Sequence, residues 1–261
     1  MTFSIRPILL FVALAVCAGE IRAADSAPVT VFMIGDSTMA DKPVIPAHPE
    51  RGWGQMLPTY FKDGVRIENH AMNGRSTRSF IAEGRWKVVL ERVKVGDYVI
   101  IQFGHNDEKA EDPKRGTGPF TDFKGNLARF VKETREHGGT PILATPVSRR
   151  MFAADGTLAE THRDYPKAVR QLAEEQKVPL LDLEARSREL LTQLGPERSK
   201  ALFMWVAKGD YAAIPGGRED NTHFNAYGAT RMCDLAVIEM KKAAPNLAVQ
   251  LREGASDPMK K

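Results

Sequence analysis

The sequence predicts an α/β protein in which a parallel β-sheet is covered by helices on both faces. Short apolar runs recur along the 261 residues, and they are nearly continuous, as in strands buried on both sides. Stretches with apolar residues at helical spacing separate these runs. Strands that alternate with helices in this way build parallel sheets, because each crossover helix returns the chain to the same edge.

Five runs mark the expected strands. They are residues 29–34, 65–70, 97–103, 141–145 and 178–183. The second run alternates apolar and polar residues, whereas the third is continuous over Tyr98–Phe103. Both patterns are typical of strands, the first half-buried and the second fully buried.

Six helical patterns accompany the strands. They cover residues 53–61, 86–93, 123–137, 165–175, 183–194 and 226–242. In the third, Leu127, Phe130 and Val131 share one face, and Gly138 follows where the pattern ends. Asn225 directly precedes the last pattern and is its expected N-cap.

The first residues differ in character from the rest. Arg6 precedes an apolar stretch and then small residues, which is the pattern of a secretory signal peptide. The apolar stretch is shorter than the ~20 residues needed to span a bilayer. We therefore expect a signal peptide over residues 1–24, cleaved between 18 and 24, and a single domain over residues 25–261. The mature protein would be secreted or periplasmic and off the membrane. A lipid anchor on Cys17 is the weaker alternative, since Val16 is bulky for the preceding position.

Composition excludes several classes of function. The formal net charge is only +4, and the chain has no basic stripe, zinc-ligand spacing or glycine-rich phosphate loop. We therefore expect a monomer that binds no nucleic acid, nucleotide, metal or cofactor. After cleavage only Cys233 remains, within a helical pattern, so an internal disulfide is impossible and a buried thiol is expected.

Two long loops separate predicted elements. Residues 40–51 are rich in proline and follow Ser37, and residues 208–222 come just before His223. Loops of this length in compact domains are usually functional or disordered.

Polar residues with complementary chemistry follow the expected strands. They are Ser37 after the first strand, Gly74 after the second, Asn106 after the third, and Asp220 with His223 before the last helix. In open α/β sheets ligands bind beyond the carboxyl ends of the strands, so these residues are expected to meet there.

These residue types suit acyl transfer. A serine hydroxyl needs a base, and the base needs an orienting group, which His223 and Asp220 would supply to Ser37. The backbone N–H groups of Ser37 and Gly74 and the side-chain amide of Asn106 are candidate donors to an oxyanion. Asp220 and His223 are expected on one short loop.

Other residues near these positions keep two interpretations. Arg75 and Arg78 either bind the carboxylate of an acidic sugar or are ordinary solvated arginines. His105 either contacts substrate or packs to hold the Asn106 loop. Trp205 and Tyr211 flank the loop leading to His223, where aromatic rings could stack on sugars.

Three further residues are expected to be structural. Asp36 would accept hydrogen bonds from local turn amides, and Asp107 would anchor a cap or turn. Trp53 begins an amphipathic pattern and is expected in the core.

The motifs resemble the four blocks of the SGNH (GDSL-type) hydrolases. Longer strings are similar to bacterial rhamnogalacturonan acetylesterases, carbohydrate esterase family twelve. They are IGDSTMADKP, RGWGQMLP, NGRSTRSF, IQFGHND and DNTHFNAYGA. The blocks occur in order over about residues 30–230. Secreted fungal relatives carry disulfides, and this chain departs from them there.

The resemblance implies a flavodoxin-like three-layer sandwich with a five-stranded parallel sheet, the SGNH hydrolase fold. It implies a secreted serine esterase that removes acetyl groups from galacturonate residues of rhamnogalacturonan through an acetyl-enzyme. Ser37 would be the nucleophile, Gly74 and Asn106 would complete the oxyanion hole, and Asp220 and His223 would complete the triad. The partner would be an acetylated pectic polysaccharide or oligosaccharide.

Alternatives remain at this stage. The same chemistry would serve a deacetylase of another glycan such as xylan, or a lipase-like or thioesterase hydrolase. A non-catalytic carbohydrate-binding protein on the same scaffold is an alternative of a different class. Binding alone, however, does not require a nucleophile, a base and a carboxylate together.

Overall fold

A central five-stranded parallel sheet organises the molecule. The computed structural model describes Met1 and residues 28–44 and 48–255, so the expected cleavage site and Cys17 lie outside the described residues. The strands are β1 (Thr30–Gly35), β3 (Arg66–Asn69), β4 (Tyr98–Gln102), β5 (Thr140–Ala144) and β6 (Leu180–Leu181). Their order, β3-β1-β4-β5-β6, is the flavodoxin-like order, which confirms the predicted fold.

The interior strand β1 explains why the apolar runs are continuous. It pairs in parallel with β3 on one side and β4 on the other, and all six of its residues are buried. Successive side chains of a strand point to opposite faces. Val31 and Met33 therefore enter one apolar core, and Phe32 and Ile34 enter the other.

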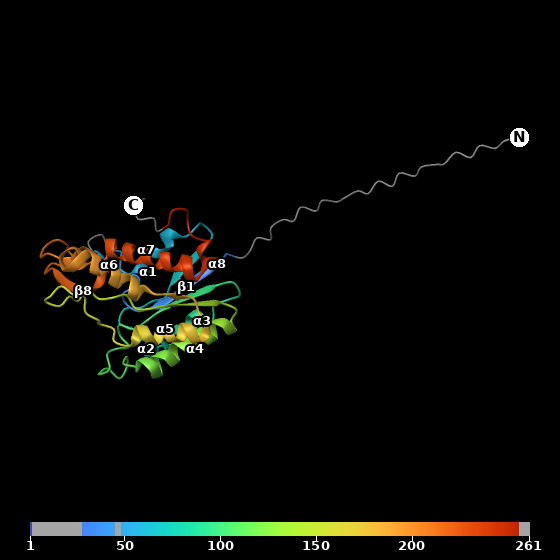
Figure 1. The fold of residues 1–261 in the computed structure, drawn as a ribbon, viewed down its shortest axis with the longest axis horizontal. Coiled ribbons are helices and arrows are strands. Elements are labelled where there is room, and N and C mark those ends of the chain that lie inside the picture. Colours follow the sequence, from blue (N-terminus) through green and yellow to red (C-terminus); the bar gives the residue numbers. More distant parts are fainter. Residues whose placement is uncertain (2–27, 45–47, 256–261) are drawn as a thin grey trace.

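Helices cover both faces of the sheet, as Figure 1 shows. One core is closed by α1 (Trp53–Met56), α6 (Leu183–Arg198) and α7 (Ala226–Ala243). The other is closed by α2 (Thr77–Ala82), α3 (Arg85–Leu90), α4 (Lys124–Glu136) and α5 (Tyr165–Gln176). Trp53 is fully buried in the first core, as predicted. The fold is thus a three-layer sandwich.

The helix predictions differ from the structure mainly in short elements. The pattern over 53–61 divides into α1 and the 3₁₀ turn η1 (Leu57–Tyr60), whose second residue is a proline. The short helices α2 and α8 (Pro245–Ala248) were not expected. The remaining turns are η2 (Pro119–Phe123) and η3 (Ser199–Leu202). Within the part of the chain that the structure describes, no helix is long and apolar enough to cross a membrane.

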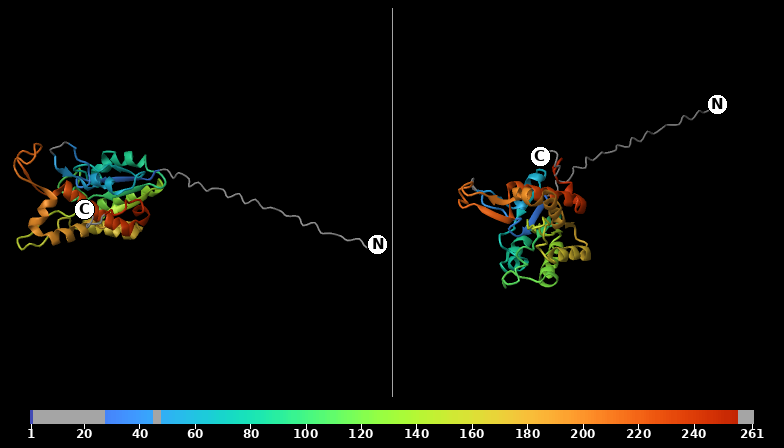
Figure 2. Two further views of the ribbon diagram at one scale, coloured as in Figure 1. Left: turned by 90° about the horizontal axis from the view of Figure 1, so that it is seen from above. Right: turned by 60° about the vertical axis from the view of Figure 1, so that its left-hand side comes forward.

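A second sheet, which the sequence analysis missed, takes up residues from both long loops. It is antiparallel, in the order β2-β8-β7, with β2 (Glu50–Arg51), β7 (Phe203–Val206) and β8 (Arg218–Asn225). Figure 2 shows its orange strands at one end of the molecule. The sequence of β8, REDNTHFN, is polar with a single buried residue, Phe224, so it carries no strand periodicity. Its hydrogen bonds to two partner strands decide its conformation.

The start of α7 is held close to the backbone before β7. The Asn225 side chain caps the helix by accepting a hydrogen bond from Gly228 N at 2.9 Å, which confirms the predicted N-cap. A Cβ atom at Gly228 would lie 1.8 Å from the carbonyl oxygen of Leu202. Glycine is therefore needed here for close backbone approach.

We predict that Gly228→Ala lowers the free energy of unfolding by roughly 2 kcal/mol or more, because α7 must move off the backbone of Leu202. The matched control is Gly125→Ala in α4, where a Cβ atom would meet no atom within 4 Å. That substitution is expected to stabilise the protein by up to about 1 kcal/mol, since alanine favours helix. Urea denaturation of both variants checks the opposite signs; equal effects would contradict the packing argument.

Candidate active site

Ser37 lies in a tight turn at the carboxyl end of β1. The backbone N–H of Ala40 donates to the Asp36 carbonyl at 3.0 Å and closes the turn. The Asp36 carboxylate accepts hydrogen bonds from Thr38 N at 3.0 Å and Thr38 Oγ1 at 2.8 Å. Asp36 is fully buried, so the structure confirms that it anchors the turn. The half-buried Ser37 is left with its hydroxyl available.

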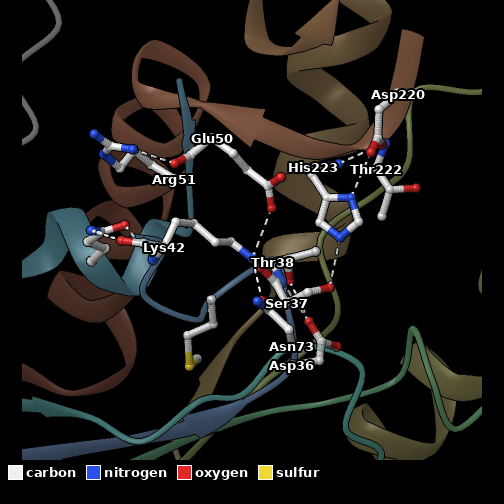
Figure 3. A network of polar contacts seen from close by, with 12 residues as sticks. Asp36, Ser37, Thr38, Lys42, Glu50, Arg51, Asn73, Asp220, Thr222 and His223 are labelled. Carbon is white, nitrogen blue, oxygen red and sulfur yellow. Dashed lines mark hydrogen bonds and ion pairs between the residues drawn. The ribbon is translucent and has the colours of Figure 1, made fainter. Parts of the chain in front are cut away.

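The side chains of Ser37, His223 and Asp220 form one hydrogen-bonded chain, which Figure 3 shows. His223 Nε2 lies 2.9 Å from Ser37 Oγ, and His223 Nδ1 lies 2.8 Å from Asp220 Oδ2. With the proton on Nδ1, the ring donates to Asp220 and Nε2 accepts from the serine hydroxyl. This is the geometry that lets a histidine act as a base toward serine.

The backbone around His223 is a bulge in β8 and not the loop expected from sequence. Phe224 pairs with Phe203, yet the next pair is Asp220 with Met204, so residues 221–223 are inserted on one strand. Asp220 Oδ1 accepts from Thr222 N at 2.7 Å and from His223 N at 3.0 Å. One carboxylate oxygen thus holds the bulge and the other holds the imidazole.

Asp220 remains ionised at neutral pH. Burial by itself raises the pKa of this carboxyl, but the hydrogen bonds from the His223 ring and backbone and from Thr222 N outweigh burial and bring the pKa well below its usual range. A carboxylate that accepts several N–H bonds behaves in this way. It therefore keeps a negative charge beside the imidazole.

Gly74 and Asn106 adjoin each other beside the end of β1. Arg75 N donates to Met72 O at 3.3 Å, and Gly74 has φ of +76° at the third position of this turn. Asn106 Nδ2 donates to Arg75 O at 3.1 Å, and Met72 N donates to Gly35 O at 3.0 Å. The turn with Gly74, the amide of Asn106 and the end of β1 therefore form one connected group.

His105 packs beneath the Ser37 turn. It is 3 % exposed, and its Nδ1 lies 3.2 Å from Asp36 Oδ2. Its ring meets His162 edge to face, with centroids 4.4 Å apart. Of the two interpretations of His105, the structure matches the packed one. Burial lowers the pKa of His105 to about 4, so the ring is neutral.

Asp107 anchors the start of α2, as expected. It is fully buried and accepts from Thr77 N at 3.0 Å and Thr117 Oγ1 at 3.1 Å. Burial raises the pKa of Asp107 to about 7 despite these hydrogen bonds. It contacts none of Ser37, His223 and Asp220 by a hydrogen bond, so it belongs to the scaffold of the site.

The arginines after Gly74 already have carboxylate partners. Arg75 Nε lies 3.0 Å from Glu83 Oε2, and Arg78 Nη2 lies 2.5 Å from Asp122 Oδ2. Both pairs are partly exposed, so each is a weak interaction that a ligand can displace. The structure therefore gives neither arginine a free charge directed at Ser37.

Trp205 and Tyr211 share one hollow. They line a cavity of about 500 Å³ together with His48, Arg51 and Tyr227. The indole Nε1 of Trp205 donates to Asn221 Oδ1 at 2.9 Å, next to the bulge. Two cations also lie over its ring in cation–π contacts, with Arg150 Cζ 4.9 Å and Lys200 Nζ 4.6 Å from the ring centroid. The two predicted aromatic residues are thus brought together near the His223 segment.

Charged residues that the sequence analysis missed surround the Ser37–His223 pair. Lys42 Nζ donates to Ser37 O at 2.7 Å and pairs with Glu50 Oε1 at 3.0 Å (Figure 3). Glu50 Oε2 receives Arg218 Nη1 at 2.7 Å, and Arg218 Nη2 also donates to Asp220 Oδ2. In the sequence, only their position in the two long loops could have indicated that these charged residues belong to the site, because single charges in loops follow no periodic pattern.

No group of three or more histidine, cysteine or carboxylate side chains suited to a metal ion occurs among residues 28–44 and 48–255. Cys233 is buried in α7, where its Sγ contacts the carbonyl oxygen of Trp53 at 2.8 Å. The thiol is therefore part of the core, as expected.

The fold, the GDS turn and the serine–histidine–aspartate chain define a class of hydrolase. Residues 33–231 match the model of the GDSL-like Lipase/Acylhydrolase family, and the chain belongs to this family. It is 43% identical over 208 residues to rhamnogalacturonan acetylesterase RhgT of Bacillus subtilis (strain 168), covering 80% of this chain and 88% of RhgT.

A second relative is also described as an acetylesterase. The probable rhamnogalacturonan acetylesterase YesY of Bacillus subtilis (strain 168) is 32% identical over 212 residues, which is 81% of this chain and 92% of YesY. The crystal structure of Bacillus subtilis YxiM superposes with a TM-score of 0.70 and 31% identity, covering 82% of this chain and 56% of YxiM. The chain thus spans little more than half of YxiM. Family and relatives together identify a carboxylic ester hydrolase.

We predict that the buried His105 makes the fold sensitive to acid. Its pKa in the folded state is about 4, below its ordinary value of 6.5, so the unfolded chain binds more protons between these values. Stability is therefore lost as the pH falls from 6.5 toward 4, by up to about 3 kcal/mol. His105→Gln is expected to flatten this part of the profile in urea denaturation at pH 4.5, 5.5 and 7. His137→Gln, at an exposed helix end, is the control; an equal flattening there would contradict the prediction.

Proposed function

We propose that this esterase removes acetyl groups from the galacturonate residues of rhamnogalacturonan by a serine mechanism. The observation that carries the proposal is the hydrogen-bonded chain from Ser37 Oγ through His223 to Asp220. The substrate is inferred from the names of the two relatives, both described as rhamnogalacturonan acetylesterases.

Acylation begins with the serine hydroxyl. Ser37 Oγ attacks the acetyl carbonyl carbon while His223 Nε2 takes the hydroxyl proton. Asp220 stabilises the imidazolium and keeps the second ring proton on Nδ1. The oxyanion would be met by the N–H groups of Ser37 and Gly74 and by the Asn106 amide, each worth ~3 kcal/mol of barrier lowering.

Departure of the sugar completes acylation, and deacylation then uses the same groups. The proton on His223 passes to the departing sugar oxygen, so the sugar leaves as a neutral alcohol and the acetyl group stays on Ser37. Water then attacks the acetyl-enzyme while His223 accepts its proton. Collapse of the second intermediate returns that proton to Ser37 Oγ and frees acetate.

The site is open enough for a polymer. The His223 side chain is 24% exposed and Ser37 is half-buried, so an acetyl group on a chain in solution can reach both. We assign sugar contacts to the cavity lined by Trp205 and Tyr211, since the indole is tied to the bulge through Asn221. Secretion or periplasmic location and a monomeric state complete the proposal, and they rest on the sequence.

We predict that the purified protein releases acetate from acetylated rhamnogalacturonan and that Ser37→Ala abolishes this release. Acetylated xylan and a medium-chain acyl ester are assayed beside it. Release only from xylan or only from the acyl ester would retain the serine mechanism and overturn the substrate. No release from any of the three by folded protein would overturn the proposal.

We predict that Asp220→Asn lowers kcat by roughly 10³- to 10⁴-fold, because an amide neither stabilises the imidazolium nor holds the right tautomer. The matched control is Asp155→Asn. Asp155 Oδ1 accepts from Thr157 N at 2.9 Å, the same two-residue turn that Asp220 Oδ1 makes with Thr222 N at 2.7 Å, but without a histidine. Steady-state rates on 4-nitrophenyl acetate compare the two; similar losses would show that the turn and not the charge matters.

A further inference from the structure

A buried carboxylate, Glu50, lies between two cations that reach opposite halves of the site. Lys42 holds one of its oxygens and Arg218 holds the other. We propose that Lys42, Glu50 and Arg218 are positioning residues, a charged chain that aligns Ser37 with His223 and balances the charge beside the imidazole. This inference rests on the proposed serine mechanism but not on the identity of the glycan.

The Lys42 end joins the nucleophile turn to the turn that carries Gly74. The Lys42 side chain is 3% exposed, and Nζ donates to Ser37 O at 2.7 Å and to Asn73 Oδ1. Its third contact is Glu50 Oε1 at 3.0 Å. An ammonium has three donors, so all of them are used inside the protein. The residue cannot release one contact to bind substrate without losing an internal one.

The Arg218 end joins Glu50 to the base. Nη1 donates to Glu50 Oε2 at 2.7 Å, while Nη2 donates to Asp220 Oδ2 and lies 3.3 Å from His223 Nδ1. The flat guanidinium can bridge two carboxylates in fixed directions, which a lysine cannot. Arg218 therefore shares with His223 the oxygen of Asp220 that orients the ring.

The backbone explains why Glu50 is at this place. β2 pairs with β8, with Glu50 opposite Asn225 and Arg51 opposite Phe224. Lys42 and Glu50, from the two ends of the proline-rich stretch, thus meet at the site. A buried carboxylate without partners is strongly destabilising, so the two cations also stabilise Glu50 in this position.

The charged groups around His223 come from several elements and include two pairs of opposite charge. Asp220 and Arg218 on β8 contribute one negative and one positive charge. Glu50 on β2 and Lys42 after β1 contribute another pair, which Arg218 connects to the His223 ring. Asp36 beneath Ser37 adds a further negative charge, because its partners His105 and Thr38 are neutral.

Because charges of both signs surround the imidazole, removing a cation and removing an anion should shift the pH–rate profile in opposite directions. Arg218→Gln removes a cation, which favours the protonated imidazole, so the acidic limb of the pH–rate profile should move to higher pH. Glu50→Gln removes an anion, so the limb should move to lower pH. Each shift is expected to be roughly 0.5 pH units in this partly solvated site. If Arg218 and Glu50 had only a structural role, their substitution would not shift the acidic limb in a direction that follows the sign of the charge removed.

The experiment measures the second-order rate constant for labelling of Ser37 by a fluorophosphonate between pH 5 and 9. Ser37 Oγ forms the bond to phosphorus, fluoride leaves, and His223 takes the hydroxyl proton. This readout needs no natural substrate. We expect the two opposite limb shifts and a plateau rate at least about 10-fold lower in each variant, because alignment is lost.

Two further variants separate charge from alignment. Arg218→Lys keeps the charge but cannot span both carboxylates, so the limb should stay near its wild-type position while the plateau falls. The double variant Arg218→Gln/Glu50→Gln loses one cation and one anion and so has the wild-type net charge. Its acidic limb should therefore lie at the wild-type pH, while its plateau rate stays low. These two variants keep the test decisive if a single substitution prevents folding.

The molecule offers a matched control pair. Arg186 and Glu239 form an ion pair between α6 and α7 with an N–O distance of 2.7 Å and 34% and 11% side-chain exposure. The Arg218–Glu50 pair has the same distance and 32% and 10% exposure. Arg186→Gln and Glu239→Gln should change neither limb nor plateau.

Each outcome decides one claim. Absent limb shifts, shifts of one sign in both variants, or unchanged plateaus would overturn the charged chain. Limb shifts of the expected signs in a protein that releases no acetate would support the chain and overturn the proposed acetylesterase function. Acetate release by the wild type, with no effect of Arg218→Gln or Glu50→Gln on labelling, would support the acetylesterase function and overturn the charged chain.

Discussion

The hydrogen bond between Ser37 Oγ and His223 Nε2 is the interaction on which the rest of the site depends. It joins residues that are 186 positions apart in the sequence. Ser37 follows β1, an interior strand of the parallel sheet, whereas His223 lies in a bulge of the antiparallel sheet. The chemistry therefore requires that two separately built parts keep their alignment to within a few tenths of an ångström.

Paired carboxylates hold these parts, two of them buried and Asp220 partly buried. Asp36 holds the Ser37 turn, Asp220 holds the His223 bulge, and Glu50 lies between the two. A buried charge is costly unless it is fully paired, so each carboxylate admits few arrangements of its neighbours. Lys42 and Arg218 satisfy Glu50 and at the same time reach Ser37 and Asp220. Donors fixed before the reaction are the arrangement that stabilises developing charge most effectively.

Local pattern predicted the elements whose own residues decide their structure. β1 is a nearly continuous apolar run buried on both faces, and α4 has a clear apolar stripe, so both give a strong signal in the sequence. The cap of α7 was predictable because Asn225 bonds within its own turn. β8 was missed because its polar residues become a strand only by pairing with β2 and β7. The short α2 was missed too, since six residues contain too little periodicity.

The sequence by itself determined the candidate residues of the site: Ser37, Gly74, Asn106, Asp220 and His223 follow strands or precede a helix, positions that a parallel sheet gathers at one edge. Only the tertiary structure decided which charges accompany them. It paired Arg75 with Glu83, buried His105 against Asp36, and brought Glu50 between two cations. The physical reason is the separation of the interacting residues along the sequence. Periodicity and helix caps depend on residues a few positions apart, whereas these contacts depend on how distant segments pack.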